Sequence, residues 1–418
     1  MIGLKFEVYG IEPIPAIERK SGWLDLFLIW AGSSICLPSF VLGAMLVPAF
    51  AWKDALAINL LGNLVVGLLI AAGGMFGVRA GQPAVMMGRH VFGNGAGQLL
   101  PTWLLLISML GWFAVITALT GQSINYLLQQ RTGFSSPALV IIIVGVINSS
   151  TAVAGYKRIR SLSLGLVPLL ALACVVIIYR LSHLGSLPVA LAYTPVPTMS
   201  FGQGLNIIIG GSIAGALIAS DYSRYSRSGG GSVVGTLGGT FLVSFLLGIL
   251  GMISQAVTGS WNPLLLFEGY EWFVLVFTFL AAWTTNDNLL YSCGLALSNL
   301  VPTSRWINTV ICGLLGIVLA LLGISEHITS WLNLLSTFIP ALLGVLLAHL
   351  LLAGKAFPEK VNWKALLATA AGALAACLVP AWLISSLVSL GISFMVYSLL
   401  IAPGRLPKKP SSEIDLLQ

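Results

Sequence analysis

Twelve long apolar segments separated by short polar connections dominate this 418-residue sequence. A helix needs about 20 apolar residues to cross the hydrocarbon core of a bilayer, and each segment is close to this length. Only 8% of the residues are charged, whereas soluble chains carry about 25%. The segments cover residues 25–47, 54–78, 98–119, 137–155, 161–183, 204–220, 232–258, 273–299, 306–324, 328–352, 363–380 and 381–402. The sequence therefore predicts an all-α membrane protein with about twelve transmembrane helices.

The polar residues outside these segments predict tails rather than further domains. We expect tails at residues 1–24 and 403–418, and a transmembrane domain over residues 25–402. The first 22 residues carry several charges and lack a continuous apolar core, so they are not predicted to be a cleavable signal peptide.

Lysine and arginine are distributed unequally between the two sides of the predicted helices. One side would carry the N-terminus and 17 of the 20 basic residues, and the other would carry only Lys53, Arg131 and Arg180. Because basic residues are retained in the cytoplasm, both termini are predicted to be cytoplasmic, in the inner membrane of a bacterium. The net charge of +7 follows from this topology, and a nucleic-acid partner is not needed to explain it. We expect no obligate protein partner.

Cysteines and histidines show no spacing typical of a catalytic or metal site. The residues are Cys36, Cys174, Cys293, Cys312 and Cys377, with His90, His183, His327 and His349. The chain also lacks a GxxxxGK[ST] motif, which argues against ATP-driven transport. We therefore predict no catalytic residues and no organic cofactor, which leaves a passive channel or membrane enzyme as weak alternatives to a secondary transporter.

Two apolar segments contain small or helix-breaking residues at their centres. They are WAGSSICLPSF at 30–40 in the first segment and GGSIAG at 210–215 in the sixth. Secondary transporters place their sites at such breaks, in matching positions of two inverted repeats, although glycine also serves close helix packing. The pairing favours a five-plus-five inverted repeat, with repeat one over about 25–183, repeat two over 204–352 and extra helices over 363–402.

The eighth segment holds an unusual polar run, AAWTTNDNLLYS at 281–292. The hydroxyls of Thr284 and Thr285, with carbonyls freed by a break in a facing helix, are hard oxygen ligands suited to sodium. Alternatively, both hydroxyls bond back to the preceding turn. Asp287 is a functional candidate because ionisable groups are costly inside a membrane. It would carry a proton or be fixed by neighbouring helices.

Trp112 lies near the middle of the third segment, away from the interface where membrane tryptophans concentrate. Its indole offers a flat face on which a planar heterocycle can stack. A packing role opposite Gly111 is the alternative.

At these residues the chain resembles the nucleobase:cation symporter family, which includes the bacterial cytosine permeases. The matching motifs are GVRAGQPAVMMGRHVFG at 77–93, GWF at 111–113, SDYSRY at 220–225, WTTNDNLLYSCGL at 283–295 and WLNLLSTFIP at 331–340. The resemblance covers nearly the whole chain and implies the five-plus-five fold of the LeuT kind. It also implies alternating access.

The resemblance implies a sodium site and a substrate site. Sodium would be held by carbonyls of Gly32, Cys36 and Ala281 and by the hydroxyls of Thr284 and Thr285. The substrate would stack on Trp112 beside Gly211 and Ser212, where the family has an aromatic residue in place of Ser212. Family hydrogen-bonding positions are Met109, Ala214 and Ala281 here, which puts cytosine itself in doubt.

Together these patterns predict a symporter that imports a nucleobase or related pyrimidine with a cation, most simply sodium. The alternatives are a transporter of hydroxymethylpyrimidine, a thiamine precursor, and a proton-coupled permease that uses Asp287.

Overall fold

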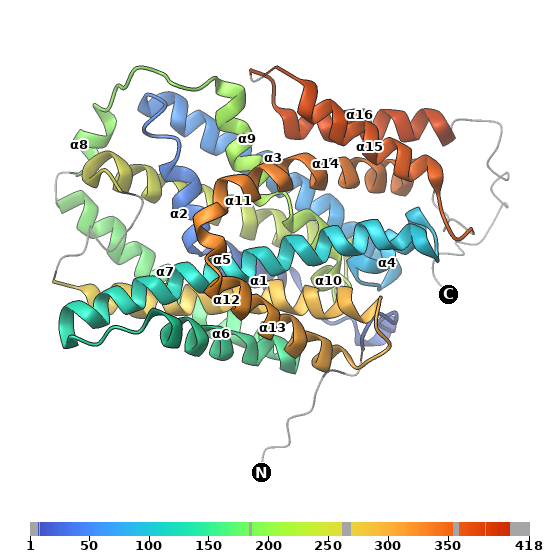
Figure 1. Cartoon of the computed structure of the whole chain (residues 1–418), viewed down its shortest axis with the longest axis horizontal. Coiled ribbons are helices and arrows are strands. Elements are labelled where there is room, and N and C mark those ends of the chain that lie inside the picture. Colours follow the sequence, from blue (N-terminus) through green and yellow to red (C-terminus); the bar gives the residue numbers. More distant parts are fainter. Residues whose placement is uncertain are drawn as a thin grey trace, which may run out of the picture.

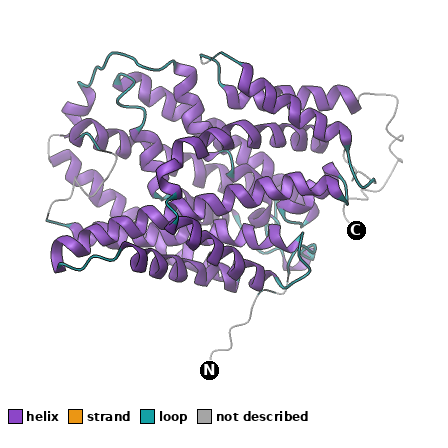
Figure 2. Ribbon diagram, viewed as in Figure 1, coloured by secondary structure: helices purple, strands orange, loops and turns teal. Residues whose placement is uncertain are grey.

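The structure, a computed structural model, describes residue 7 and residues 9–183, 186–260, 269–353, 359–380 and 382–401. Figure 2 shows that helices account for the regular structure of these ranges, apart from an isolated bridge between Ser21 and Ser226. The α-helices are α1 (Trp23–Ser34), α2 (Leu37–Ala44), α3 (Trp52–Ala80), α4 (Ala84–Phe92), α5 (Leu99–Thr132), α6 (Pro137–Ala154), α7 (Tyr156–His183), α8 (Ser186–Leu191), α9 (Phe201–Ser212), α10 (Gly215–Ser223), α11 (Gly229–Thr258), α12 (Glu271–Ser298), α13 (Arg305–Leu321), α14 (Ile328–Leu352), α15 (Trp363–Leu378) and α16 (Ser385–Ile401).

Each predicted apolar segment coincides with a helix or with a pair of consecutive helices. Among the described residues, eight helices are long and apolar enough to cross a membrane, and α1 with α2 makes a ninth span if the pair is counted as one. Helices α13, α15 and α16 are apolar but shorter. The third predicted segment was too short, because α5 continues to Thr132.

The first predicted break is a sharp one. Helices α1 and α2 meet at an angle of 61°, and Ile35 and Cys36 lie between them. The Ser39 hydroxyl donates to the Ser34 carbonyl at 2.7 Å, so it bonds a group that the interruption frees. Pro38 at the start of α2 suits this position, because proline is tolerated in the first turn of a helix.

The second predicted break is milder than the first. Helix α9 ends at Ser212 and α10 begins at Gly215, but residues Phe201–Ser223 still form one continuous apolar span. The two predicted breaks are therefore one sharp bend and one two-residue interruption.

The helices pack into two main groups and an edge (Figure 1). We call α1, α2, α3, α10 and α11, which pack on one another, the α11 group. Helices α5, α6, α12 and α13 likewise pack together and form the α12 group. Helices α14, α15 and α16 pack together, and Figure 1 shows α15 and α16 at one edge.

Glycines of α11 allow its backbone to touch the backbones of α1 and α2. A Cβ atom added at any of them would overlap the neighbouring chain: Gly235 against Trp23, Gly239 against Phe27, and Gly251 against Phe40. A Cβ atom added at Gly43 of α2 would likewise overlap the backbone of Gly248 in α11. We call this contact the glycine seam. Small residues permit such close approach of membrane helices.

A carboxylate from the N-terminal segment joins both helix groups at one end of the molecule. Glu7 forms ion pairs with Arg224, after α10, at 3.5 Å and with Arg305, in α13, at 3.4 Å. It also accepts hydrogen bonds from the Tyr291 hydroxyl at 3.0 Å, the Tyr156 amide at 3.1 Å and the Tyr225 hydroxyl. We call these six residues the Glu7 junction.

The Glu7 junction is largely closed to water. Arg224 is fully buried and Arg305 is 5% exposed. Burial raises the pKa of the Tyr225 hydroxyl, so this group stays protonated and donates its hydrogen to Glu7. Two buried guanidinium groups thus share one carboxylate, which keeps both helix groups together at this end.

Candidate functional site

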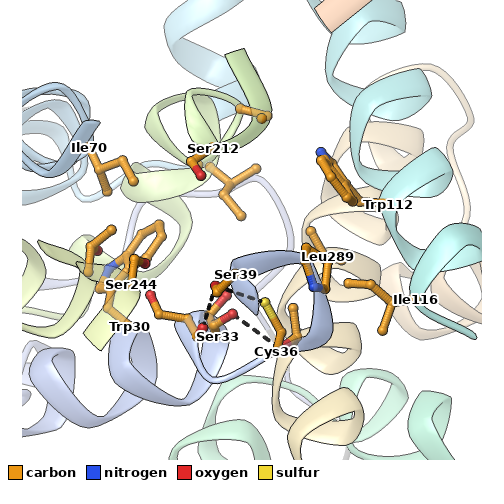
Figure 3. Close-up of a pocket in the computed structure, with 18 of the residues that line it drawn as sticks. Trp30, Ser33, Cys36, Ser39, Ile70, Trp112, Ile116, Ser212, Ser244 and Leu289 are labelled. Atoms are coloured by element: carbon orange, nitrogen blue, oxygen red, sulfur yellow. Dashed lines mark hydrogen bonds between the residues drawn. The ribbon is translucent and has the colours of Figure 1, made fainter. Parts of the chain in front are cut away.

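A cavity lies at the bend between α1 and α2, between the two helix groups (Figure 3). Its volume is about 100 Å³, several times the roughly 30 Å³ that one water occupies in the liquid. None of the residues that line it is charged. The cavity therefore suits a small, uncharged molecule.

Five of the six predicted substrate residues line this cavity. Helix α5 contributes Met109 and Trp112, and the region of the second interruption contributes Gly211, Ser212 and Ala214. The sixth, Ala281, is not among the lining residues; its carbonyl belongs to the threonine cluster described below. Their role in substrate binding remains a prediction.

Apart from Thr285, the wall formed by α5 and α12 is largely apolar. Met109, Trp112 and Ile116 recur at intervals of three and four residues, so they share one face of α5, and Leu289 of α12 continues this wall. The neighbouring Gly111 faces elsewhere and packs against Trp331. Trp112 lines the cavity and is otherwise buried, and its stacking role remains a prediction.

The threonines of α12 bring their hydroxyls onto the carbonyls at the end of α1. Thr284 donates to the Gly32 carbonyl at 3.0 Å, and Thr285 donates to the Ser33 carbonyl at 3.1 Å. Both hydroxyls also lie within hydrogen-bond distance of the Ala281 carbonyl in the preceding turn of α12, at 3.0 and 3.1 Å. The bonds that the alternative predicted are therefore present as well. We call this group of oxygens the threonine cluster.

The oxygens of the threonine cluster are of the type that alkali cations prefer. Its members are hydroxyl and carbonyl oxygens, the neutral hard ligands that also serve alkali cations elsewhere. Gly32 allows a close approach here, because a Cβ would lie 2.9 Å from a methyl group of Val167 and 3.4 Å from Thr284. Cys36 lies at the start of α2 and lines the cavity. Since Thr285 lines the cavity too, the cluster and the cavity are contiguous.

Asp287 belongs to neither of these two sites. It is buried and accepts a hydrogen bond from Thr151 of α6 at 3.3 Å. Trp283 donates to the same threonine hydroxyl at 3.1 Å. The side chain therefore points toward α6, and its role in coupling remains a prediction.

Sequence reasoning missed the polar residues that α11 contributes to the cavity, Thr240 and Ser244. A signal was present in the sequence. Ser232, Thr236, Thr240 and Ser244 recur every four residues, which places four hydroxyls along one face of a helix. Ser33, Ser34 and Ser39 also line the cavity.

Within the described residues, no group of three or more histidine, cysteine or acidic side chains is arranged to hold a metal ion. The predicted cation ligands are of a different kind, because all are neutral oxygens.

Comparison with known proteins identifies the family. Residues 13–397 match the family model for permeases for cytosine/purines, uracil, thiamine and allantoin. The chain belongs to this permease family. It is therefore a multi-pass membrane transporter and not an enzyme.

Relatives and solved structures agree with this assignment. A cytosine permease of Escherichia coli O157:H7 is 29% identical over 372 residues, covering 86% of each chain. A structure of Mhp1, a nucleobase-cation-symport-1 family transporter in a closed conformation with bromovinylhydantoin bound, matches 93% of both chains with a TM-score of 0.83 and 21% identity. An inward-facing Mhp1 structure matches 94% of both chains with a TM-score of 0.77 and 21% identity. The predicted all-α membrane fold is confirmed.

Proposed function

We propose that this permease is a sodium-coupled symporter that imports a neutral nucleobase or related pyrimidine by alternating access. The observation that carries the proposal is the contiguity of the threonine cluster with a cavity that contains Trp112. Sodium bound by Thr284 and Thr285 would hold α12 against the bend after α1. The same interaction would order the wall on which the substrate stacks.

The distribution of charged residues supports an orientation in which one particular end of the protein faces the cytoplasm. Glu7, Arg19, Arg160, Arg224 and Arg305 are on the side predicted to be cytoplasmic, and Arg160 pairs with Asp25 at 2.6 Å beside the start of α1. We assign the Glu7 junction to the cytoplasmic end, with both termini in the cytoplasm of a bacterium. The junction would then have to separate when substrate is released inward.

Uptake into proteoliposomes tests the coupling ion. The assay compares labelled cytosine, uracil and hydroxymethylpyrimidine with and without a sodium gradient. Thr284→Ala removes one oxygen ligand and should raise the sodium concentration for half-maximal uptake about tenfold, which corresponds to about 1.4 kcal/mol. Thr284→Ser keeps the hydroxyl and serves as the matched control.

The rival function, proton coupling at Asp287, predicts the opposite pattern. Asp287→Asn should retain sodium-dependent uptake under our proposal, because this side chain contacts Thr151 and lies outside the threonine cluster. Uptake that is independent of sodium, and that Asp287→Asn abolishes, would refute sodium coupling. If the protein took up amino acids and none of these heterocycles, the proposed substrate class would be refuted.

A further inference from the structure

The cavity has two walls of different chemistry. The α12 group supplies Met109, Trp112, Ile116 and Leu289, whose side chains are largely apolar, and Thr285, whose hydroxyl is already used in the threonine cluster. Helices α9 and α11 supply Ser212, Thr240 and Ser244. Figure 3 shows Ser212 and Ser244 on one side of the cavity, with Trp112, Ile116 and Leu289 on the other.

The hydroxyls of the polar wall have no partner in the part of the chain that the structure describes. Among the described residues, the structure shows no hydrogen bond from the side chains of Ser212 and Ser244, and the buried hydroxyl of Thr240 has no partner. Ser39, in the same cavity, instead donates to Ser34 at 2.7 Å. Thr240 is buried, and a buried hydroxyl without a partner is unfavourable. Ser212 and Ser244 are half-buried and line the same cavity. All three hydroxyls are therefore available to a ligand that enters the cavity.

Helix geometry does not explain these free hydroxyls. Serine and threonine in helices commonly bond back to the carbonyl four residues earlier, as Thr102, Ser149 and Thr369 do here. No such bond is present at Thr240 or Ser244 in α11. Thr240 and Ser244 therefore line the cavity with hydroxyls that do not bond back to α11.

We propose that Ser212, Thr240 and Ser244 form the specificity wall of the substrate site, which hydrogen-bonds the polar edge of a neutral heterocycle stacked on Trp112. The inference rests on the proposed function and names the substrate class. Hydroxyls both donate and accept, so they match ring N–H and C=O groups along one edge. A substrate carboxylate or ammonium group finds no opposite charge among the lining residues.

This assignment places the two substrate interactions on different helix groups. Stacking occurs on α5, in the α12 group, and hydrogen bonding occurs largely on α11. A heterocycle that satisfies both walls bridges the two groups. A ligand that interacts with only one wall would still bind, but it would hold the two helix groups together less firmly.

The test is calorimetric binding to the purified full-length protein in saturating sodium chloride. The probes are cytosine, uracil, hydantoin, hypoxanthine and the charged pyrimidine orotate, together with N-methyl analogues that lack one ring N–H. Ser244→Ala should weaken binding of the best neutral probe about tenfold. It should change the affinity of the analogue that lacks the bonded N–H by less than about twofold.

Two further variants complete the test. Trp112→Ala should weaken the probe and its analogue equally, since stacking does not depend on the N–H. Thr236→Val is the matched control, because Thr236 is a buried, unpaired hydroxyl one turn from Thr240 that does not line the cavity. It should leave binding unchanged. The melting temperature without ligand checks that each variant is folded.

Each remaining outcome decides against the proposal. Equal losses for probe and analogue in Ser244→Ala, or no loss for either, would overturn the specificity wall while leaving the proposed function intact. The same would follow if Thr236→Val reproduced the effect. Tight binding of orotate would overturn the neutral substrate class. A wild-type protein that binds none of the heterocycles would refute this inference and the proposed function together.

Discussion

The central cavity and the Glu7 junction are both polar clusters inside an apolar protein, but their hydrogen bonding is opposite. In the cavity, Ser212, Thr240 and Ser244 lack partners within the described structure. In the junction, both carboxylate oxygens of Glu7 are bonded, and two arginines pair with them. The comparison teaches that hydroxyls without partners are available to a ligand where they line a cavity, whereas a carboxylate with both oxygens bonded joins parts of the protein.

Replacing Glu7 should have the largest effect on stability, and it tests whether the Glu7 junction joins the helix groups. Glu7→Ala leaves Arg224 and Arg305 buried without a counter-charge, and breaking a buried pair costs about 3–5 kcal/mol. We expect a large fall in the melting temperature of the purified protein. Glu12→Ala removes an exposed carboxylate of the same segment and should be nearly neutral. Equal melting temperatures for the two variants would contradict a structural role for the junction.

Replacing Trp112 should have the next largest effect, and would act only on the cavity. Stacking of a base on an aromatic side chain is worth about 1–3 kcal/mol, so Trp112→Ala should raise the KM for uptake about tenfold or more. The control is Trp103→Ala, since Trp103 is on the same helix but is 52% exposed and does not line the cavity. An unchanged KM in Trp112→Ala would show that the substrate does not stack on this side chain.

A polar group added to the apolar wall should have a smaller effect and would sharpen the comparison. Met109→Gln places an amide in the cavity, where its burial without a ligand should cost about 1 kcal/mol. We expect a slightly lower melting temperature, partly recovered when cytosine supplies hydrogen bonds. Met109→Leu keeps the wall apolar and is the control. If cytosine stabilised Met109→Gln no more than Met109→Leu, the walls would not differ in how they bind substrate.

Much of the fold was predictable, because lipid requires long apolar helices and the sequence shows them directly. The bend after α1 was predictable from Gly32 and Pro38, since both residues disfavour a continuous helix. The convergence of Thr284 and Thr285 on the end of α1 was also expected, from the resemblance and from the polar run in α12.

Other features could not be predicted, because they depend on contacts between distant residues. Glu7 lies in a charged segment without any periodic pattern, and its partner Tyr291 is 284 positions away. Thr240 and Ser244 were overlooked because hydroxyls in a helix usually bond back to their own backbone. Only the packing of α11 shows that these two do not. The mildness of the second interruption was not predictable either, because Gly210, Gly211 and Gly215 indicate a break without fixing its angle.

The glycine seam determines which parts of the molecule can move separately. Backbones in contact along most of α11 cannot slide without overlap, so α1, α2 and α11 should turn as one rigid body. The dihedral changes then fall on the connections that flank it, residues 45–51 and 224–228. Amide hydrogen exchange during turnover should accordingly be slower along α11 than in these two connections.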